Sequence, residues 1–153
     1  MKTRLILVAA GLALLTVVGG CKKKEKADEN ACNGKNFCMK MNGTLFAEDA
    51  TWRTINDTRY RIEIGGGKVE MDFYGSIAAD TYTVVASPST SGQGGFQYYV
   101  QGKNNAKGQS GTLTITSVDN NTLSGNFKVT ATDAVAGGTL EITEGHFYNV
   151  TKK

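Results

Sequence analysis

The chain has 153 residues, with 17 Lys and Arg, 14 Asp and Glu, 19 Gly and one Pro. Its length suits a single domain, and the many Gly and Thr residues favour strands and turns over helices. From Ala31 onward, 11 basic residues are balanced by 11 acidic ones. A neutral domain lacks the basic stripe that neutralises nucleic-acid phosphates, so nucleic acid is excluded as a partner.

The first 20 residues have the pattern of a signal peptide. Lys2 and Arg4 form a short basic region, and residues 5–18 follow without a charge. This stretch is shorter than the about 20 apolar residues that span a bilayer, and it fits the apolar region of a secretory signal. We predict three segments: a signal peptide at 1–20, a lipid-bearing Cys with a charged tether and a disulfide loop at 21–40, and an all-β domain at 41–153.

Cys21 follows the signal segment in a sequence typical of lipid attachment. Residues 18–21 (VGGC) resemble the lipobox of bacterial lipoproteins, in which an aliphatic residue precedes two small residues and Cys. Small side chains let a peptidase reach the backbone, and the thiol takes diacylglycerol. Two or three acyl chains anchor a protein firmly, because each buried methylene adds about 0.8 kcal/mol. We expect Cys21 to carry lipid and to make the membrane a partner; the alternative is a transmembrane anchor followed by a buried Cys.

Lipidation of Cys21 leaves an even pair of thiols, Cys32 and Cys38. Thiols of exported proteins form disulfides, so we predict that these two are bonded. Their spacing, with no His nearby, is a poor zinc signature. Residues 22–30 carry seven charges and no aromatic or β-branched residue, which predicts a disordered tether. The alternative is that the lysines of this segment contact anionic headgroups.

From Met41 onward, apolar and polar residues alternate with the period of a β-strand. Two hairpins are clear: residues 60–74 turn at Gly65–Gly67, and residues 113–129 turn at Asp119–Asn121. The glycines supply the positive φ that such a turn requires. Weaker strands are expected at 51–56, 81–86, 96–101 and 140–150, with loops at 87–95 and 102–111.

The sequence therefore predicts an all-β fold: a single antiparallel meander of about eight strands that forms a sandwich or a partly open barrel. One polar face on each strand favours antiparallel pairing. In the last strand the alternation breaks, since Ile142, Tyr148 and Val150 share one face and Phe147 lies on the other, with Gly145 as a candidate bulge. The aromatic residues expected in the core are Trp52, Tyr60, Phe73, Tyr82, Phe96, Tyr98, Phe127 and Phe147.

Tyr74 and Tyr99 fall on the outward positions of their strands. If these two side chains lie near each other, they form a binding patch. Glu70 and Asp72 share the outward face of one strand, where we expect solvated carboxylates. The Asp119–Asn121 turn lacks the longer acidic pattern of a calcium loop.

His146 is the one His of the chain, and Glu144 lies two positions before it. A Glu/His pair on one strand face would do acid–base work, but a surface position explains both residues as well. No other residue completes a catalytic set. We therefore expect no catalytic residue, no cofactor and no metal site.

Five stretches in chain order resemble a family of small lipoproteins from Bacteroidota that is known only as a domain of unknown function. They are 41–43 (MNG) followed by Trp52, 80–82 (DTY), 111–116 (GTLTIT), 123–127 (LSGNF) and 142–147 (ITEGHF). The resemblance covers residues 41–150 and implies an all-β envelope lipoprotein without catalytic residues. Relatives often carry an acidic export signal after the lipid-bearing Cys, where this chain has three lysines.

These observations indicate a lipid-anchored lipoprotein of the cell envelope whose β domain binds or supports a partner without catalysis. We expect it in the outer membrane, with the periplasmic and the surface face both open. The first alternative is a lipocalin-like carrier of a small apolar ligand, which needs a cavity beside the inward Gly125. The second is a hydrolase-type enzyme, which needs a cleft that joins His146 to an acid.

Overall fold

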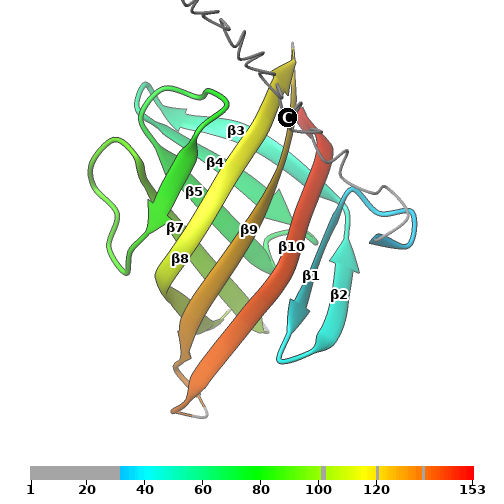
Figure 1. The fold of residues 1–153 in the computed structure, drawn as a ribbon, viewed down its shortest axis with the longest axis vertical. Helices are drawn as coiled ribbons and strands as arrows, with labels where there is room; N and C mark the ends of the chain where they lie inside the picture. Colours follow the sequence, from blue (N-terminus) through cyan, green and yellow to red (C-terminus); the bar gives the residue numbers. More distant parts are fainter. Residues whose placement is uncertain (1–31, 101–102, 120, 136) are drawn as a thin grey trace, which may run out of the picture.

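The computed structural model describes residues 32–100, 103–119, 121–135 and 137–153, and these form ten strands in one sheet (Figure 1). The predicted all-β fold is confirmed. No helix in the described ranges is long and apolar enough to cross a membrane. The strands are β1 (Phe37–Met41), β2 (Thr44–Glu48), β3 (Ala50–Asn56), β4 (Arg59–Ile64), β5 (Val69–Tyr74), β6 (Thr81–Val84), β7 (Gln93–Val100), β8 (Lys103–Asp119), β9 (Thr122–Asp133) and β10 (Thr139–Lys152).

Hydrogen bonds join the strands in a ring. β3, β4 and β5 form one antiparallel meander, and β8, β9 and β10 form a second. β7 connects the two by pairing with both β5 and β8, while β6 is inserted beside β7 and β8. The ring closes through a short parallel contact in which Thr151 and Lys152 of β10 lie opposite Thr51 and Trp52 of β3.

β10 changes its partner along its length. Its residues 142–147 pair with β1, which carries β2 on its other edge, and its end pairs with β3. The side-chain amide of Asn36 links the starts of β1 and β3, since it donates to the Ala50 carbonyl at 3.0 Å and accepts from the Ala50 N–H at 2.6 Å. The predicted disulfide is confirmed, with the Cα atoms of Cys32 and Cys38 5.1 Å apart.

Aromatic and aliphatic side chains fill the space inside the ring. The aromatic residues predicted for the core are all buried or packed against it. Phe147 and Phe127 lie directly over two glycines of neighbouring strands. A Cβ on Gly125 would lie 2.3 Å from the Phe147 ring, and one on Gly145 would lie 2.6 Å from the Phe127 ring. The space that a carrier would need beside Gly125 is therefore occupied by Phe147.

Two bulges in β10 change which side chains face inward. The register shifts between Ile142 and Gly145 and again between Phe147 and Val150, and Glu144 and Asn149 adopt φ of 49° and 44°. Each bulge adds a residue, so Ile142, Phe147 and Val150 all reach the core. The expectation that Phe147 lies on the other face from Ile142, Tyr148 and Val150 is therefore wrong. Tyr148 instead packs outside, against the disulfide.

The expectation of a loop over residues 102–111 is also wrong, because β8 begins at Lys103. This part of β8 pairs with β7 on one edge and β9 on the other. A Cβ on Gly108 would lie 3.0 Å from Val84 and Phe96 and 3.2 Å from Val129. The glycine here serves close packing between strands and does not mark a loop.

A charged ladder as the candidate functional site

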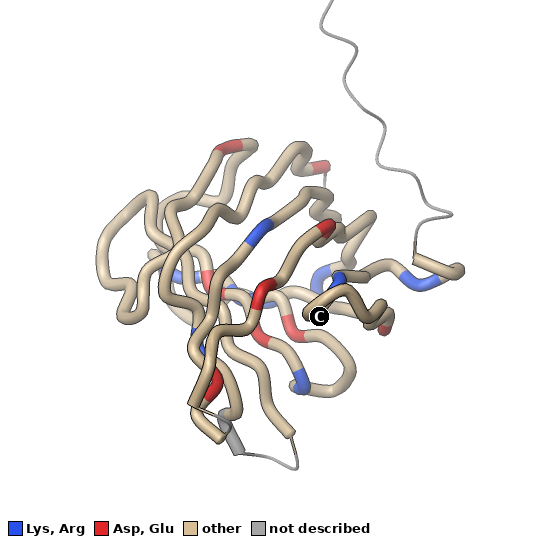
Figure 2. The backbone as a smooth tube through the Cα atoms, turned by 60° about the horizontal axis from the view of Figure 1, so that its bottom comes forward, with Lys and Arg blue, Asp and Glu red and all other residues tan. Residues whose placement is uncertain are grey.

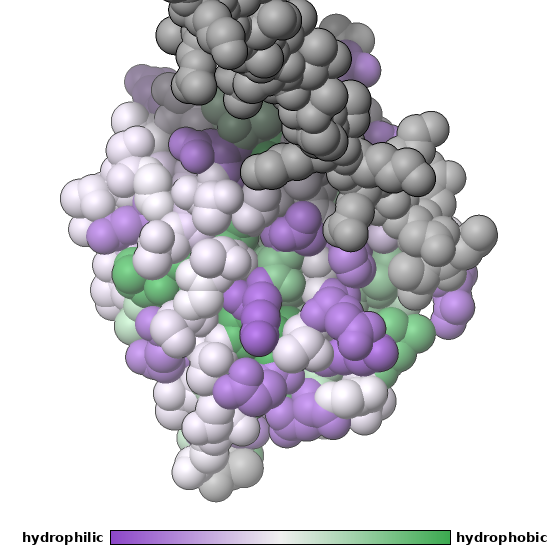
Figure 3. Space-filling view, viewed as in Figure 1, coloured by the Kyte–Doolittle hydropathy of each residue, from purple (hydrophilic) through white to green (hydrophobic). Residues whose placement is uncertain are grey.

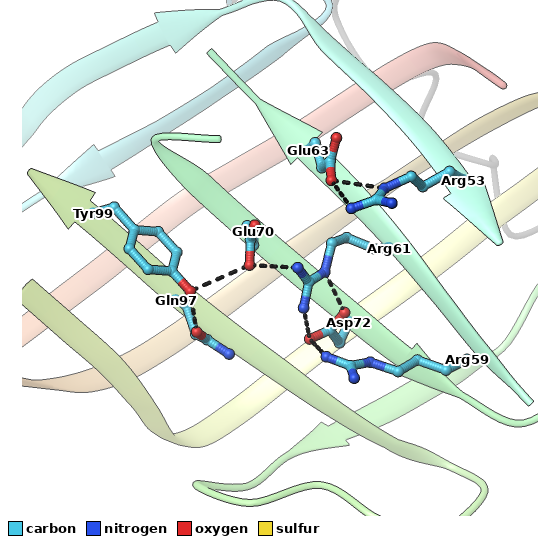
Figure 4. Close-up of polar contacts among 8 residues, drawn as sticks. All are labelled: Arg53, Arg59, Arg61, Glu63, Glu70, Asp72, Gln97 and Tyr99. Carbon is cyan, nitrogen blue, oxygen red and sulfur yellow. Dashed lines mark hydrogen bonds and ion pairs between the residues drawn. The ribbon is translucent and has the colours of Figure 1, made fainter. Parts of the chain in front are cut away.

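The outer face of β4, β5 and β7 carries a connected row of polar and charged side chains. The Gly65–Gly67 turn fixes the β4–β5 register so that Arg61 lies opposite Asp72 and Arg59 opposite Tyr74. Inward neighbours on the same strands fill the core, which leaves these side chains outside. We call the row the outer ladder, and Figure 4 shows all of its members except Tyr74. Its members are Tyr74, Arg59, Asp72, Arg61, Glu70, Gln97 and Tyr99.

Asp72 is the centre of the outer ladder. Although it lies on the outside of the sheet, only 2% of it is exposed. The Arg59 Nη2 donates to Oδ2 at 2.7 Å, and Arg61 donates through Nε to Oδ1 at 2.8 Å and through Nη2 to Oδ2 at 3.0 Å. Pro88 covers the neighbouring position, since a Cβ on Gly95 would lie 3.1 Å from its ring. The carboxylate is thus enclosed by two guanidinium groups and a loop.

The electrostatics of Asp72 follow from this enclosure. Burial is the largest single influence and opposes ionisation, but the hydrogen bonds and positive charges of Arg61 and Arg59 together outweigh it, so the pKa of Asp72 lies below its ordinary value. The same hydrogen bonds raise the pKa of both Arg59 and Arg61. All three groups are therefore ionised at neutral pH.

The outer ladder continues from Arg61 to Tyr99. Arg61 Nη1 lies 2.7 Å from Glu70 Oε2, and the Tyr99 hydroxyl contacts Glu70 Oε2 at 3.3 Å and also Gln97 Oε1. Burial, followed by the charge of Glu70, raises the pKa of Tyr99. The Tyr99 hydroxyl thus remains protonated at neutral pH. Its contacts with Glu70 and Gln97 hold the ring in a fixed orientation.

At the other end, the Arg59 guanidinium carbon lies 5.4 Å from the centre of the Tyr74 ring. This is a cation–π contact. The buried Nε of Arg59 has no hydrogen-bond partner among the described residues. Tyr74 and Tyr99 therefore stand at opposite ends of one connected row, with Arg59, Asp72 and Arg61 between them.

A shallow groove of about 640 Å³ opens at the Tyr99 end. Its residues are Arg61, Gly65, Gly66, Gly67, Lys68, Glu70 and Tyr99. A Cβ on Gly66 or Gly67 would meet nothing within 4 Å, so bare backbone borders open space there. Lys68 Nζ lies 2.7 Å from Glu48 Oε1, which pairs this cation as well.

The structure changes the interpretation of the two carboxylates on β5. Glu70 is half-buried in its ion pair with Arg61, and Asp72 is buried, so the expectation that both are solvated is wrong. Arg59 and Arg61 were not singled out from the sequence. The β4–β5 register could have identified them, because it places Arg61 directly opposite Asp72.

The other residues considered for chemistry have structural partners. Glu144 Oε2 lies 2.6 Å from Lys40 Nζ, whereas the His146 ring stacks on Tyr148 with centroids 6.0 Å apart. The Asn121 carbonyl accepts hydrogen bonds from Trp52 Nε1 and the Lys152 N–H. In the described part of the chain, no group of three or more His, Cys, Asp or Glu is placed to hold a metal ion. Cys21 lies outside the described residues.

The face of β8 and β9 differs from the outer ladder. Its outward positions are mostly Thr, Ser and Asn. Figure 3 shows this side of the molecule as pale, weakly polar areas interspersed with purple hydrophilic ones. Among the described residues, acidic and basic side chains are interspersed and do not separate by sign (Figure 2). The described surface thus presents one densely paired charged face and one hydroxyl-rich face.

A sequence profile of the family described as Domain of unknown function (DUF6252) matches residues 33–151. The matched region contains every residue of the outer ladder. No curated protein and no solved structure matches the chain.

Proposed function

We propose that this protein, which belongs to the DUF6252 family, is a lipid-anchored protein of the cell envelope that binds a partner through the outer ladder and its groove. On this proposal it does not catalyse a reaction and needs no cofactor. Its membrane partner is reached through lipid on Cys21, and nucleic acid is not a partner because the domain is neutral.

Two features support export and anchoring. The basic, apolar and small-residue segments before Cys21 occur in the order of a lipoprotein signal. The Cys32–Cys38 disulfide fits an oxidising compartment, since disulfides persist outside the cytoplasm. We place the protein in the outer membrane, and either face of that membrane is compatible with the proposal.

The observation that carries the binding role is the burial of charge on an outside face. Removing an ion from water costs several kcal/mol, and charged side chains on a solvated strand face do not incur that cost. Here Asp72 and Arg61 are largely removed from water and held by mutual hydrogen bonds. Such fixed polar groups beside an aromatic ring and a groove can orient a bound ligand.

The alternatives receive less support. A carrier needs interior space beside Gly125, and the Phe147 ring lies there. A hydrolase needs His146 next to an acid, and the two side chains that suggested this, His146 and Glu144, contact Tyr148 and Lys40. We therefore assign the partner to the outside of the sheet.

Site-specific photo-crosslinking in living cells tests this assignment. A benzoylphenylalanine at position 99 places the crosslinker in the groove, and the same residue at Asn126 on the exposed face of β9 is the control. We expect a discrete adduct from position 99 and none from 126. Equal adducts at both positions, or none at 99, would contradict binding through the outer ladder.

A further inference from the structure

We infer that the groove between Tyr99 and the Gly65–Gly67 turn binds an uncharged saccharide. This inference rests on the proposed function, because it names a ligand class for the same surface. It is drawn from the charge balance of the groove, from the backbone that forms part of its wall, and from the fixed ring at its edge.

The charges of the groove are already paired with one another. Arg61 lies 2.7 Å from Glu70 and 2.8 Å from Asp72, and Lys68 lies 2.7 Å from Glu48. An ionic ligand at Arg61, whose side chain is only 15% exposed, would have to displace Glu70 or Asp72 and leave a part-buried charge unpaired, which is costly. An uncharged ligand leaves every pair in place.

Paired charges still offer hydrogen bonds to hydroxyl groups. A carboxylate has about four acceptor sites and a guanidinium five donor hydrogens, more than the ion pairs of Glu70 and Arg61 use. A sugar hydroxyl both donates and accepts, so one hydroxyl can bridge a carboxylate and a guanidinium that lie side by side. The adjacent Arg61 and Glu70 provide this combination.

The wall of the groove admits a ligand close to the backbone. Gly65, Gly66 and Gly67 have φ of 57°, 69° and 92°, a conformation that disfavours residues with a Cβ. At Gly66 and Gly67 the absent side chain leaves open space. Bare backbone thus lies within reach of a ligand along this edge.

Tyr99 supplies the apolar part of the site. Its hydroxyl is fixed by Glu70 and Gln97, so the half-buried ring loses little freedom when a ligand packs on it. A pyranose has an apolar C–H face and a rim of hydroxyl groups. A fixed ring beside adjacent donors and acceptors matches both features.

Binding is tested with the full-length protein in lauryldimethylamine oxide micelles, a detergent without a sugar headgroup. The probes are the neutral disaccharides cellobiose, lactose and chitobiose and the acidic digalacturonic acid, followed by saturation-transfer NMR and titration. We expect at least one neutral disaccharide to bind with Kd of about 1 mM, and the acidic one to bind at least about tenfold more weakly. Absence of binding by every neutral probe, or preference for the acidic one, would overturn the inference.

Two glycines provide a matched pair of variants. Gly66 and Gly137 share φ of 69°, a Cβ added to either would meet nothing within 4 Å, and only Gly66 borders the groove. Asn tolerates this conformation, so both chains are expected to fold. Gly66→Asn should weaken neutral saccharide binding about tenfold, and Gly137→Asn should leave it unchanged. Equal effects of the two variants would place the binding elsewhere.

The two proposals fail in different ways. If position 99 crosslinks to a protein and no saccharide binds, the saccharide inference fails and the proposed function stands. If neither experiment gives a signal at the groove, both fail. Tyr99→Phe adds a test of the site itself, because it keeps the ring and removes the hydroxyl that contacts Glu70, and we expect about threefold weaker saccharide binding.

Discussion

Replacing Asp72 by Asn removes one charge and almost no volume from the centre of the outer ladder. The carboxylate accepts three hydrogen bonds, at 2.7, 2.8 and 3.0 Å, from Arg59 and Arg61. Breaking a buried ion pair by removing one partner costs about 3–5 kcal/mol. The Arg59 side chain is 27% exposed and rehydrates in part, and the Asn oxygen still accepts one bond. We therefore expect a loss near the lower end, about 3 kcal/mol in the free energy of unfolding.

The control is Glu63→Gln, an acid-to-amide change on the same face. Glu63 Oε1 accepts from Arg53 Nε at 2.7 Å, but the Arg53 side chain is 46% exposed. An exposed pair of this kind contributes about 0.2–1 kcal/mol. Urea denaturation of both variants and the unchanged protein measures the difference. Equal losses below about 1 kcal/mol in the two variants would refute the argument that Asp72 is held in a buried pair.

The acid dependence of stability gives a second readout of the same residue. The pKa of Asp72 is lower in the folded protein than the about 3.9 of an unfolded chain. As the pH falls, the unfolded state therefore takes up the proton first, and the contribution of Asp72 is lost as the pH falls through about 3.9 towards the folded pKa. It is fully present above about pH 5. The urea midpoint of Asp72→Asn should change less between pH 6 and 3 than that of the unchanged protein, and parallel curves would contradict the lowered pKa.

Three further predictions concern the core and the N-terminal segment. Gly125→Ala should lower the free energy of unfolding by about 1–3 kcal/mol or more, because its Cβ would lie 2.1 Å from a backbone oxygen. The control is Gly138→Ala, whose Cβ would meet nothing within 4 Å, and equal urea midpoints for the two variants would show that the interior has room. Replacing both Cys32 and Cys38 by Ser should lower the free energy of unfolding by about 2 kcal/mol, and an unchanged thermal midpoint would contradict this. Cys21→Ser should leave an uncleaved precursor that takes up no radioactive fatty acid, and labelling of that variant would end the lipoprotein proposal.

The two hairpins could be predicted because their signals are local. Strict alternation on both sides of Gly65–Gly67 predicts β4 and β5, and the register of Ile64 opposite Val69 follows from the turn. Continuing that register places Arg61 opposite Asp72. The pairing of these two charges was therefore available from the sequence, although their burial was not.

The burial of Asp72 depends on a segment far along the chain. Pro88 reaches Gly95 on β7, which pairs with Asp72 in the register of β5 and β7. The alternation of residues in β5 carries no information about where that loop lies. The sequence therefore predicts that the outward Glu70 and Asp72 are in water.

A glycine in β8 and two bulges in β10 are the reasons why the sequence did not predict these strands correctly. Gly108 indicated a loop by composition, but pairing on both edges of β8 overrides that local preference. In β10 the bulges lie at Glu144 and Asn149, residue types that are less common at positive φ than glycine. A period-two analysis fails across each bulge, since the added residue reverses every side chain that follows.

The claim that the protein acts through its outer ladder is tested most directly by oxidative footprinting in intact cells. Photolysis of hydrogen peroxide, which crosses membranes, oxidises accessible side chains, and mass spectrometry reports each residue. Tyr74 and Tyr99 mark the two ends of the outer ladder, and the partly exposed His146 on β10 is the reference. We predict that Tyr99 is oxidised more slowly in cells than in the purified protein, relative to His146. An unchanged Tyr99 rate, with protection at His146 instead, would contradict the account and place the partner over β10.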